Sequence, residues 1–382
     1  MEWKEVRLGD ILNFRRGHDL PHSAMKPGNI PVAGSNGVIG YHDTATPMKP
    51  ILTIGRSGNV GKPYFYEEAW AHNTTLYVDD FKGNDPKFLY YLCQTMPFAN
   101  FGGGSAVPTL NRNHIHPLET KVPVNVEDQR RIASILSSLD RKIELNNKIN
   151  ADLEEMAQAI FKNWFVDFEP FKDGKFVDSE LGMIPEGWKV GRADDFYQIN
   201  IGKTPPRKEH KWFSTNPADK IWVSIANMGN SGIFISDSSE YLTKEAVDRH
   251  NIIMVPINTI LLSFKLTVGR VAIADKELTT NEAIARFILS DDKYMEYLYL
   301  YLKKYDYNSL GSTSSIATAV NSKTIKGMQM LQPSDNVIDA FHIQVNPIFE
   351  KIRSLTKENS RLSLLRDTLL PRLMSGELEI PD

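Results

Sequence analysis

The strongest constraint on the fold is a long segment, Val126–Phe165, that contains no glycine and no proline. Because these two residues weaken or break helix interiors, their absence predicts one continuous helix of roughly 60 Å. Lys142 and Asn146 are polar steps in an otherwise apolar stripe. A narrow stripe with spacings of three and four is typical of a helix that packs along a second helix. The apolar members of the stripe are Ile132, Ile135, Leu139, Ile149, Leu153, Met156 and Ile160.

A second segment with the same pattern, Asp339–Leu373, lies near the C-terminus, and Asn359 and Arg366 are its polar steps. Its apolar positions are Phe341, Val345, Ile348, Ile352, Leu355, Leu362, Leu369 and Leu373. Two interpretations stay open here: the segments form an antiparallel coiled coil, or each packs on its own domain. The interface of a coiled coil would contain Ile132, Ile135, Leu139, Asn146, Ile149, Leu153, Met156, Ile160, Ile348, Ile352, Leu355, Asn359, Leu362 and Leu369.

The chain repeats itself, and this duplication favours the coiled coil. The opening Trp-Lys, followed by a glycine at position 17, recurs as Trp188-Lys189 followed by Gly202. Three further matches pair Asn59–Lys62 (NVGK) with Thr267–Arg270 (TVGR), Ala106–Ile115 with Ile316–Ile325, and Pro123 with Pro333. An internal repeat of this length indicates two related structural units, each followed by a long helix.

The offset between the copies grows along the chain, so the second copy contains insertions. One lies within residues 201–254, where the sequence GKTPPRKEHKWF has no counterpart in the first copy. We therefore predict a first globular domain at 1–125, a long helix at 126–166, a linker at 167–184, a second globular domain at 185–334 and a second long helix at 335–376. This organisation fits the length of the chain, which is too great for one ordinary core.

Each globular domain is predicted to be α+β. Turn-rich stretches containing Val, Ile and Tyr, such as Pro50–Ile54 and Asn251–Phe264, indicate strands, and local helices are predicted at Pro86–Thr95 and Asp292–Lys304. The mixture does not alternate as βαβ units would. The fold class is thus two mixed α/β domains in tandem duplication, separated by two long helices.

Composition places the chain among soluble proteins of the cytoplasm. No apolar run approaches the length of a membrane span, and the N-terminus lacks the apolar core of a signal peptide. The single cysteine, Cys93, excludes a disulfide framework. The net charge is −3, but residues 1–125 have 12 Lys and Arg against 11 Asp and Glu, and residues 185–333 have 18 against 16. The long helices are acidic, so a nucleic acid would meet the globular domains.

No arrangement of residues for catalysis is visible in the sequence. The nine histidines are scattered, and neither zinc-binding spacings nor a nucleophile elbow nor a dinucleotide-binding fingerprint is present. The run Gly55–Pro63 (GRSGNVGKP) is not a phosphate-binding loop, because its glycines are wrongly spaced and Pro63 stands where Ser or Thr is needed. We predict neither a metal, a cofactor nor catalytic activity.

Loops at matching places in the two copies carry most of the candidate DNA-binding residues, and the inserted stretch Lys203–Trp212, the most basic local cluster, carries three more. Basic and amide side chains alternate there with small residues, which lets the backbone approach nucleic acid closely. Asn and Arg also match the edges of adenine and guanine. The alternative is that these loops only connect strands and helices. The candidates are Arg15, Arg16, Arg56, Asn59, Lys62, Asn111, Arg112, Asn113 and His114 in the first copy, and Lys203, Arg207, Lys208, Lys265, Thr267, Arg270, Asn321 and Lys323 in the second.

Three stretches resemble the specificity subunits of type I restriction-modification systems. They are the opening around Trp3–Ile11, the long segment with EDQRRIASILSSLDRKIELNNK, and the ending Leu364–Leu378 (LLRDTLLPRLMSGEL). The sequence KVGRADDF after Trp188 departs from the usual Leu-Gly-Asp, which affects a structural segment only. The recognition loops of this family diverge, so no base contact is transferred to this chain.

The resemblance implies a non-catalytic reader of double-stranded DNA, in which each domain recognises one half of a bipartite site. It also implies two methyltransferase subunits as partners, and motor-nuclease subunits in the full complex. The competing hypothesis is a scaffold whose duplicated domains bind proteins, and the near-neutral charge favours it slightly. Helices of this length would separate the half-site centres by about 10–17 base pairs.

Overall fold

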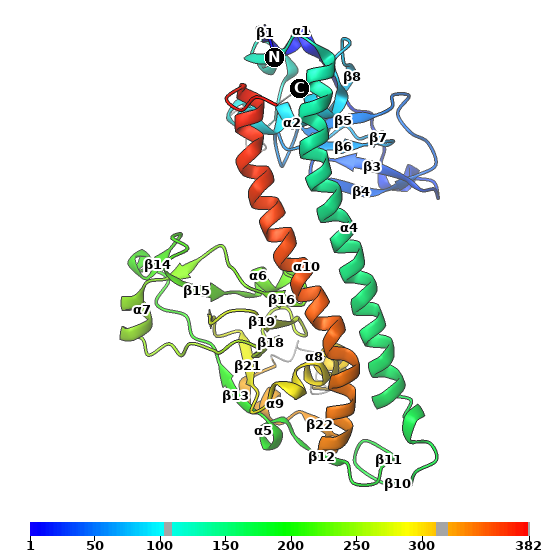
Figure 1. Cartoon of the computed structure of the whole chain (residues 1–382), viewed down its shortest axis with the longest axis vertical. Coiled ribbons are helices and arrows are strands. Elements are labelled where there is room, and N and C mark those ends of the chain that lie inside the picture. Colours follow the sequence, from blue (N-terminus) through cyan, green and yellow to red (C-terminus); the bar gives the residue numbers. More distant parts are fainter. Residues whose placement is uncertain (103–108, 311–319, 381–382) are drawn as a thin grey trace. The chain divides into compact units, whose positions relative to one another are not determined.

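The structure is a computed structural model, and it describes residues 1–102, 109–310 and 320–380. The chain forms two compact units: Met1–Leu145 with the segment from Glu358 onward is unit 1, and Asn146–Lys357 is unit 2. Each unit combines mainly antiparallel sheet with short helices, and each contains part of two long helices (Figure 1). The mixed α/β architecture with two long helices is the predicted fold class, which is confirmed.

The two long helices are α4 (Val126–Phe165) and α10 (Asp335–Ser375). The Asn125 side chain accepts a hydrogen bond from the Glu127 N–H at the start of α4, and Gly376 has a φ of 76° directly after α10. Asn125 thus satisfies one of the backbone N–H groups that have no partner within the first turn of a helix. Gly376 supplies the left-handed conformation that is common directly after a helix end.

The two long helices pack on each other in both units and run antiparallel (Figure 1). In unit 1, the Asp140 carboxylate of α4 accepts a hydrogen bond of 2.8 Å from the Arg366 guanidinium of α10, and Lys142 pairs with Glu358 at 3.5 Å. Residue numbers increase along α4 in the direction in which they decrease along α10, so the two helices are antiparallel. In unit 2, Phe341 of α10 inserts between aromatic rings of α4.

Most of the predicted apolar stripe is buried or half-buried. Ile132, Asn146, Ile352 and Leu355 are buried, and the half-buried members are Ile135, Leu139, Ile149, Leu153, Ile160, Ile348, Asn359, Leu362 and Leu369. Met156 is 53% exposed and the structure places it outside the buried face, because its neighbour Ala157 is the fully buried residue at this turn of α4. Larger buried side chains that the spacing pattern missed, Phe161 and Phe165, continue the face toward the helix end.

Unit 1 is built on three small sheets. Strand β1 (Trp3–Arg7) pairs with β9 (Glu119–Pro123) in antiparallel register. A four-stranded sheet has the order β2 (Asn13–Arg16), β8 (Thr75–Asp80), β5 (Ile51–Gly55) and β6 (Pro63–Tyr66), and a three-stranded sheet has the order β4 (Gly37–His42), β3 (Ile30–Gly34) and β7 (Trp70–Ala71). The helices are α1 (Leu8–Ile11), α2 (Pro86–Thr95) and α3 (Arg112–Ile115). The core between the four-stranded sheet, α2 and the long helices is apolar.

Unit 2 contains the same plan with additional strands. Strand β12 (Lys189–Arg192) pairs with β22 (Gln329–Gln332), and β10 (Phe176–Val177) pairs with β11 (Ile184–Pro185). The five-stranded sheet has the order β13 (Gln198–Ile201), β21 (Ile284–Ile288), β18 (Ile260–Ser263), β19 (Val271–Ala274) and β16 (Phe234–Ile235). A further sheet has the order β14 (Phe213–Ser214), β17 (Tyr241–Leu242), β15 (Lys220–Val223) and β20 (Thr279–Thr280). The helices are α5 (Ala193–Phe196), α6 (Ile225–Asn230), α7 (Lys244–Arg249), α8 (Met295–Lys304) and α9 (Ser322–Lys326).

The topology makes the duplication visible. The strand order β2-β8-β5-β6 of unit 1 recurs as β13-β21-β18-β19 in unit 2, and the pair β1–β9 recurs as β12–β22. After the matching strands β1 and β12, an aspartate accepts the N–H three residues before it, Asp10 from Arg7 at 3.1 Å and Asp195 from Arg192 at 3.0 Å. The departure of KVGRADDF from the usual motif therefore leaves this helix start intact.

None of the helices in the described part of the chain is long and apolar enough to cross a membrane.

Candidate nucleic-acid interface

In unit 1, five of the predicted DNA-binding residues come together around one groove of about 410 Å³. They arrive from three places in the chain: the end of β2, the loop after β5, and the start of α3. The predicted residues are Arg15, Arg16, Arg56, Asn111 and Arg112, and Leu76, Thr109 and Leu110 complete the lining. Four arginines line this one groove, which favours a positive potential there.

Backbone hydrogen bonds fix Arg56 at the centre of this arrangement. Its N–H donates to the Thr74 carbonyl at 2.8 Å, and its own carbonyl accepts from the Leu110 N–H at 2.8 Å. The chain on both sides of Arg56 is therefore held, so the position of the guanidinium is limited mainly by its side-chain rotamer. Arg112 is anchored over β2, because its Nη1 donates to the Phe14 carbonyl at 3.3 Å.

The electrostatics of the groove favour an anion. Partial burial, together with the positive charge of Arg16, lowers the pKa of Arg56. Arg15 lies 3.8 Å from Asp79 and Arg16 lies 3.8 Å from Asp19, but these are long, exposed ion pairs of the kind that contributes little free energy. Within the described part of the chain, Arg56 has no carboxylate partner. A phosphate group would neutralise this crowded positive charge.

His116 packs against Phe14 of β2, the strand that carries Arg15 and Arg16, although the sequence analysis singled out the nearby His114. Nε2 of His116 accepts a hydrogen bond of 3.0 Å from the Phe14 N–H, and its ring stacks on that of Phe14. Burial, aided by the charges of Arg112 and Lys82, lowers the pKa of His116, so the ring is neutral at pH 7. His114 and Asn113 are exposed on α3.

Asn111 and Asn321, which occupy matching positions in the two copies, each cap the start of a short helix, a role that the sequence analysis did not predict. The Asn111 side chain accepts a hydrogen bond of 3.0 Å from the Asn113 N–H at the start of α3. In unit 2, Asn321 likewise accepts from the Thr324 N–H at 3.0 Å and begins α9. Asparagine is preferred at this position because its oxygen satisfies an orphan N–H of the first helical turn.

The loop between β5 and β6 forms a second exposed feature of unit 1. Asn59 and Lys62 are both exposed there, and the Lys62 ammonium lies 5.3 Å from the centre of the Tyr64 ring. Residues 103–108 and 311–319 lie outside the described residues, and they include the beginnings of the matched stretches Ala106–Ile115 and Ile316–Ile325.

Unit 2 has other residues at the positions that correspond to three of the groove arginines of unit 1. In the alignment of the two copies, Asn200, Ile201 and Phe264 stand where unit 1 has Arg15, Arg16 and Arg56. The exposed predicted residues of unit 2 are instead Lys203, Arg207, Lys208, Lys265, Thr267, Asn321 and Lys323. The Lys203 ammonium donates to the His250 carbonyl at 2.5 Å.

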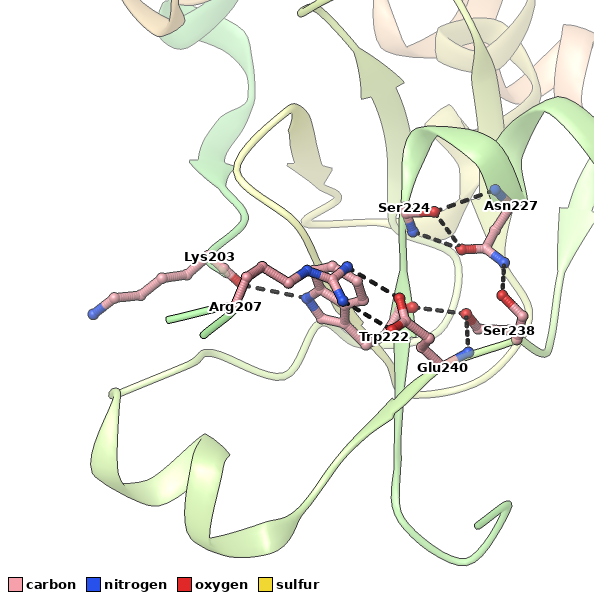
Figure 2. A network of polar contacts seen from close by, with 8 residues as sticks. Lys203, Arg207, Trp222, Ser224, Asn227, Ser238 and Glu240 are labelled. Carbon is pink, nitrogen blue, oxygen red and sulfur yellow. Dashed lines mark hydrogen bonds and ion pairs between the residues drawn. The ribbon is translucent and has the colours of Figure 1, made fainter. Parts of the chain in front are cut away.

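Two predicted arginines of unit 2 are held by internal partners. Figure 2 shows the Arg207 guanidinium facing both carboxylate oxygens of Glu240, at 2.8 and 3.0 Å. It also lies over the rings of Phe213 and Trp222, at 4.2 and 4.5 Å. Hydrogen bonds from Arg207 lower the pKa of Glu240, which therefore stays ionised.

The surrounding contacts extend this network into the inserted segment (Figure 2). The Trp222 indole N–H donates to the Lys203 carbonyl at 3.4 Å, and the Ser238 hydroxyl donates to the Trp222 carbonyl at 2.7 Å. Arg270 is also engaged, because its Nη1 donates to the Ile225 carbonyl at 2.7 Å. The positions of Arg207 and Arg270 are thus explained by the folding of unit 2 itself.

The described residues contain no group of three or more His, Cys, Asp and Glu that would hold a metal ion. The fold and its cationic loops define a class: a nucleic-acid-binding protein made of two related α/β units and two antiparallel long helices. The family described as "Type I restriction modification DNA specificity domain" matches the chain twice, over residues 1–155 and 185–335. The chain belongs to this family and is a DNA specificity subunit of a type I restriction-modification system, a subunit without catalytic activity.

Relatives and a solved structure agree with this assignment. The HindI specificity subunit of Haemophilus influenzae is 29% identical, over 98% of this chain and 94% of the relative. The MjaIX specificity subunit of Methanocaldococcus jannaschii is 31% identical, over 78% of this chain and 70% of the relative. The crystal structure of the S subunit from M. genitalium superposes with a TM-score of 0.62 at 15% identity, covering 100% of this chain and 97% of that one. The double match also supports the duplication inferred from the sequence.

Proposed function

We propose that unit 1 and unit 2 each read one half of a bipartite site in double-stranded DNA. The observation that carries this proposal is the groove of unit 1, where Arg15, Arg16, Arg56 and Arg112 converge. Phosphate contacts of this kind set the position of a protein on the duplex, while loops beside them read the base edges. Asn59, Lys62, Asn113 and His114 are exposed on the neighbouring loop and helix and are the candidates for base contacts.

For unit 2 we propose a different set of contacts. Its exposed candidates are Lys208, Lys265, Thr267 and Lys323. We leave out Lys203, Arg207, Arg270 and Asn321 because the fold already uses their polar groups. Two units of one fold with different surface residues are suited to two different half-sites. This difference supports a bipartite, non-palindromic target.

We further propose that the chain docks two methyltransferase subunits, and motor-nuclease subunits in the full complex. The duplication supports the number two, because related surfaces repeated in one chain offer two related binding places. The alternative is a scaffold that spaces protein partners without touching DNA. Only the low net charge of −3 favours it, and the arginine groove favours DNA.

The experiment that tests DNA contact is the substitution Arg56→Ala in the complex reconstituted with methyltransferase subunits. We expect binding to weaken about tenfold for every DNA sequence, and the slope of log K against log salt to fall by about one. Fluorescence anisotropy at several salt concentrations measures both quantities. Lys4→Ala is the matched control, because Lys4 is exposed on β1 and does not line the groove.

Equal salt slopes for Arg56→Ala and the unsubstituted complex would contradict a phosphate contact at Arg56. A loss confined to one position of the half-site would assign it to a base instead. No DNA binding by any form of the complex would favour the scaffold.

The long helices are proposed to set the spacing between half-sites. Inserting 21 residues, three heptads, into both α4 and α10 keeps the apolar stripe in register and lengthens each by about 31 Å. This equals about nine base pairs, close to one turn of DNA. We expect the preferred spacer to grow by about that amount with unchanged half-sites, as measured by methylation-sensitive sequencing.

An insertion of 21 residues in α4 alone, which shifts the two helices out of register, is the control and should abolish modification. A doubly lengthened chain that keeps the original spacer would contradict this role.

A further inference from the structure

The loop between β5 and β6 in unit 1 and the loop between β18 and β19 in unit 2 have the same backbone conformation. In the first, the Gly55 carbonyl accepts from the Gly61 N–H at 2.7 Å; in the second, the Ser263 carbonyl accepts from the Gly269 N–H at 3.0 Å. The residues at the two ends of each loop are joined by a further backbone bond, Gly55 to Lys62 at 3.0 Å and Ser263 to Arg270 at 2.9 Å.

Both loops also enter the left-handed region at the same two positions. Gly61 has a φ of 82° and its counterpart Gly269 a φ of 90°. At the other position unit 1 has Gly58, with a φ of 84°, but unit 2 has Leu266, with a φ of 61°. Glycine adopts this conformation without steric penalty, whereas a leucine side chain at this φ is strained.

Leu266 is unfavourable for a second reason. It is 101% exposed, so its whole side chain faces solvent, and the next apolar residue of the loop, Val268, is 36% exposed. Lys265 and Thr267 on either side are also exposed. A glycine here would remove both the backbone strain and the exposed apolar surface, as the loop of unit 1 demonstrates. Strained residues with no compensating contact point to a function.

The other non-glycine residues with positive φ in the described chain differ from Leu266 in this respect. Phe168 packs its ring on Phe176 and Trp188, and the Lys82 ammonium donates to the Gly9 carbonyl. Asn251 and Asn258 are asparagines, which tolerate this region. Among these five residues, Leu266 alone is a large apolar side chain directed entirely into solvent.

We propose that Leu266 reads the 5-methyl group of a thymine in the major groove of the half-site recognised by unit 2. This inference rests on the proposed function of unit 2. The methyl group of thymine is the apolar feature that base pairs display in the major groove. Leu266 lies at the tip of an antiparallel β-hairpin, and a two-stranded ribbon fits that groove.

The flanking residues suit the same placement. Lys265 carries a positive charge next to Leu266, which matches the phosphates that border the groove. Insertion of the leucine between stacked bases is the competing mode of contact. It requires unstacking of a base step, and it would not depend on a thymine methyl group.

The test uses the full chain reconstituted with methyltransferase subunits and the target found by methylation sequencing. Each thymine of the unit 2 half-site is replaced in turn by uracil, which lacks only the methyl group. We expect one replacement to weaken binding about fourfold, the value of one buried methyl group. Leu266→Gly should weaken binding to the thymine target about tenfold and should make binding indifferent to that uracil replacement.

Thermal unfolding separates this role from a structural one. Because Leu266→Gly removes strain and exposed apolar surface, we expect an unchanged or slightly higher Tm. Val268→Ala, which alters a neighbouring apolar residue of the same loop, is the matched control and should keep the response to uracil. A half-site of G·C pairs only, a Leu266→Gly complex that still responds to uracil, or a clear fall in Tm would each overturn the inference. If the thymine and uracil targets bind equally well to the unsubstituted complex, only Leu266 has been misassigned; if neither binds, the proposed function of unit 2 fails as well.

Discussion

Replacing Phe341 with alanine is expected to lower the free energy of unfolding by about 3–5 kcal/mol, as is usual for a large aromatic side chain removed from a core. Phe341 is fully buried, and its ring contacts those of Phe161, Trp164 and Phe165 at centroid distances of 6.3, 5.7 and 4.8 Å. These contacts join α10 to α4 in unit 2. Denaturant-induced unfolding followed by circular dichroism measures the change.

Ile343→Ala provides the matched control for this substitution. Ile343 lies two residues further along the same helix and is 74% exposed, so its removal should change stability by less than about 0.5 kcal/mol. Similar losses for Phe341→Ala and Ile343→Ala would mean that α10 does not pack on α4 through the face described.

A fragment of residues 1–180, expressed alone, is expected to form a homodimer. In unit 1, Ile132 and Leu136 of α4 share a core with Leu373 and Met374 of α10, which the fragment lacks. Since the two long helices follow related patterns, the second half of α4 from another copy is suited to replace α10. Asn146 within the stripe makes this pairing weaker than the native one. Light scattering gives the mass of the fragment in solution.

Such a dimer would carry two identical recognition units, and with methyltransferase partners it should modify a palindrome made of the first half-site. Ile149→Asp, on the predicted stripe, should prevent dimerisation. Leu145→Asp should not, because Leu145 is 53% exposed. A folded fragment that remains monomeric at micromolar concentration would contradict the pairing.

The features predicted best from the sequence were helices, because their formation depends on residues close together in the chain. The absence of glycine and proline between Val126 and Phe165 gave the bounds of α4, and the predicted helix Pro86–Thr95 is α2, where the Asp85 side chain accepts the Phe88 N–H. The stretch Asn251–Phe264 was predicted as strand, but only Ile260–Ser263 forms one. Asn251 and Asn258 have positive φ there, which turns the chain instead of extending it.

The candidate site was less predictable, because a basic residue in a loop does not show where its partner lies. Lys265 and Arg270 belong to one loop, yet Lys265 is exposed while Arg270 donates to the carbonyl of Ile225. That carbonyl begins α6, which is distant from Arg270 in the sequence, so the loop alone does not indicate the contact. The alignment did contain a signal for Leu266, since it places this leucine opposite Gly58, but only the backbone angle reveals what the difference means.

Unit 1 is discontinuous in the chain, and this imposes an order on its assembly during synthesis. Unit 2 is a single continuous stretch, whereas the core of unit 1 requires Leu373 and Met374 from the end of α10. At ribosomal rates of about 5–20 residues per second, roughly 10–40 s separate the emergence of the two parts of unit 1. Through that interval Ile132 and Leu136 have no native cover from α10, while unit 2 is free to fold. The half of the protein that is translated first is therefore the half whose core is completed last.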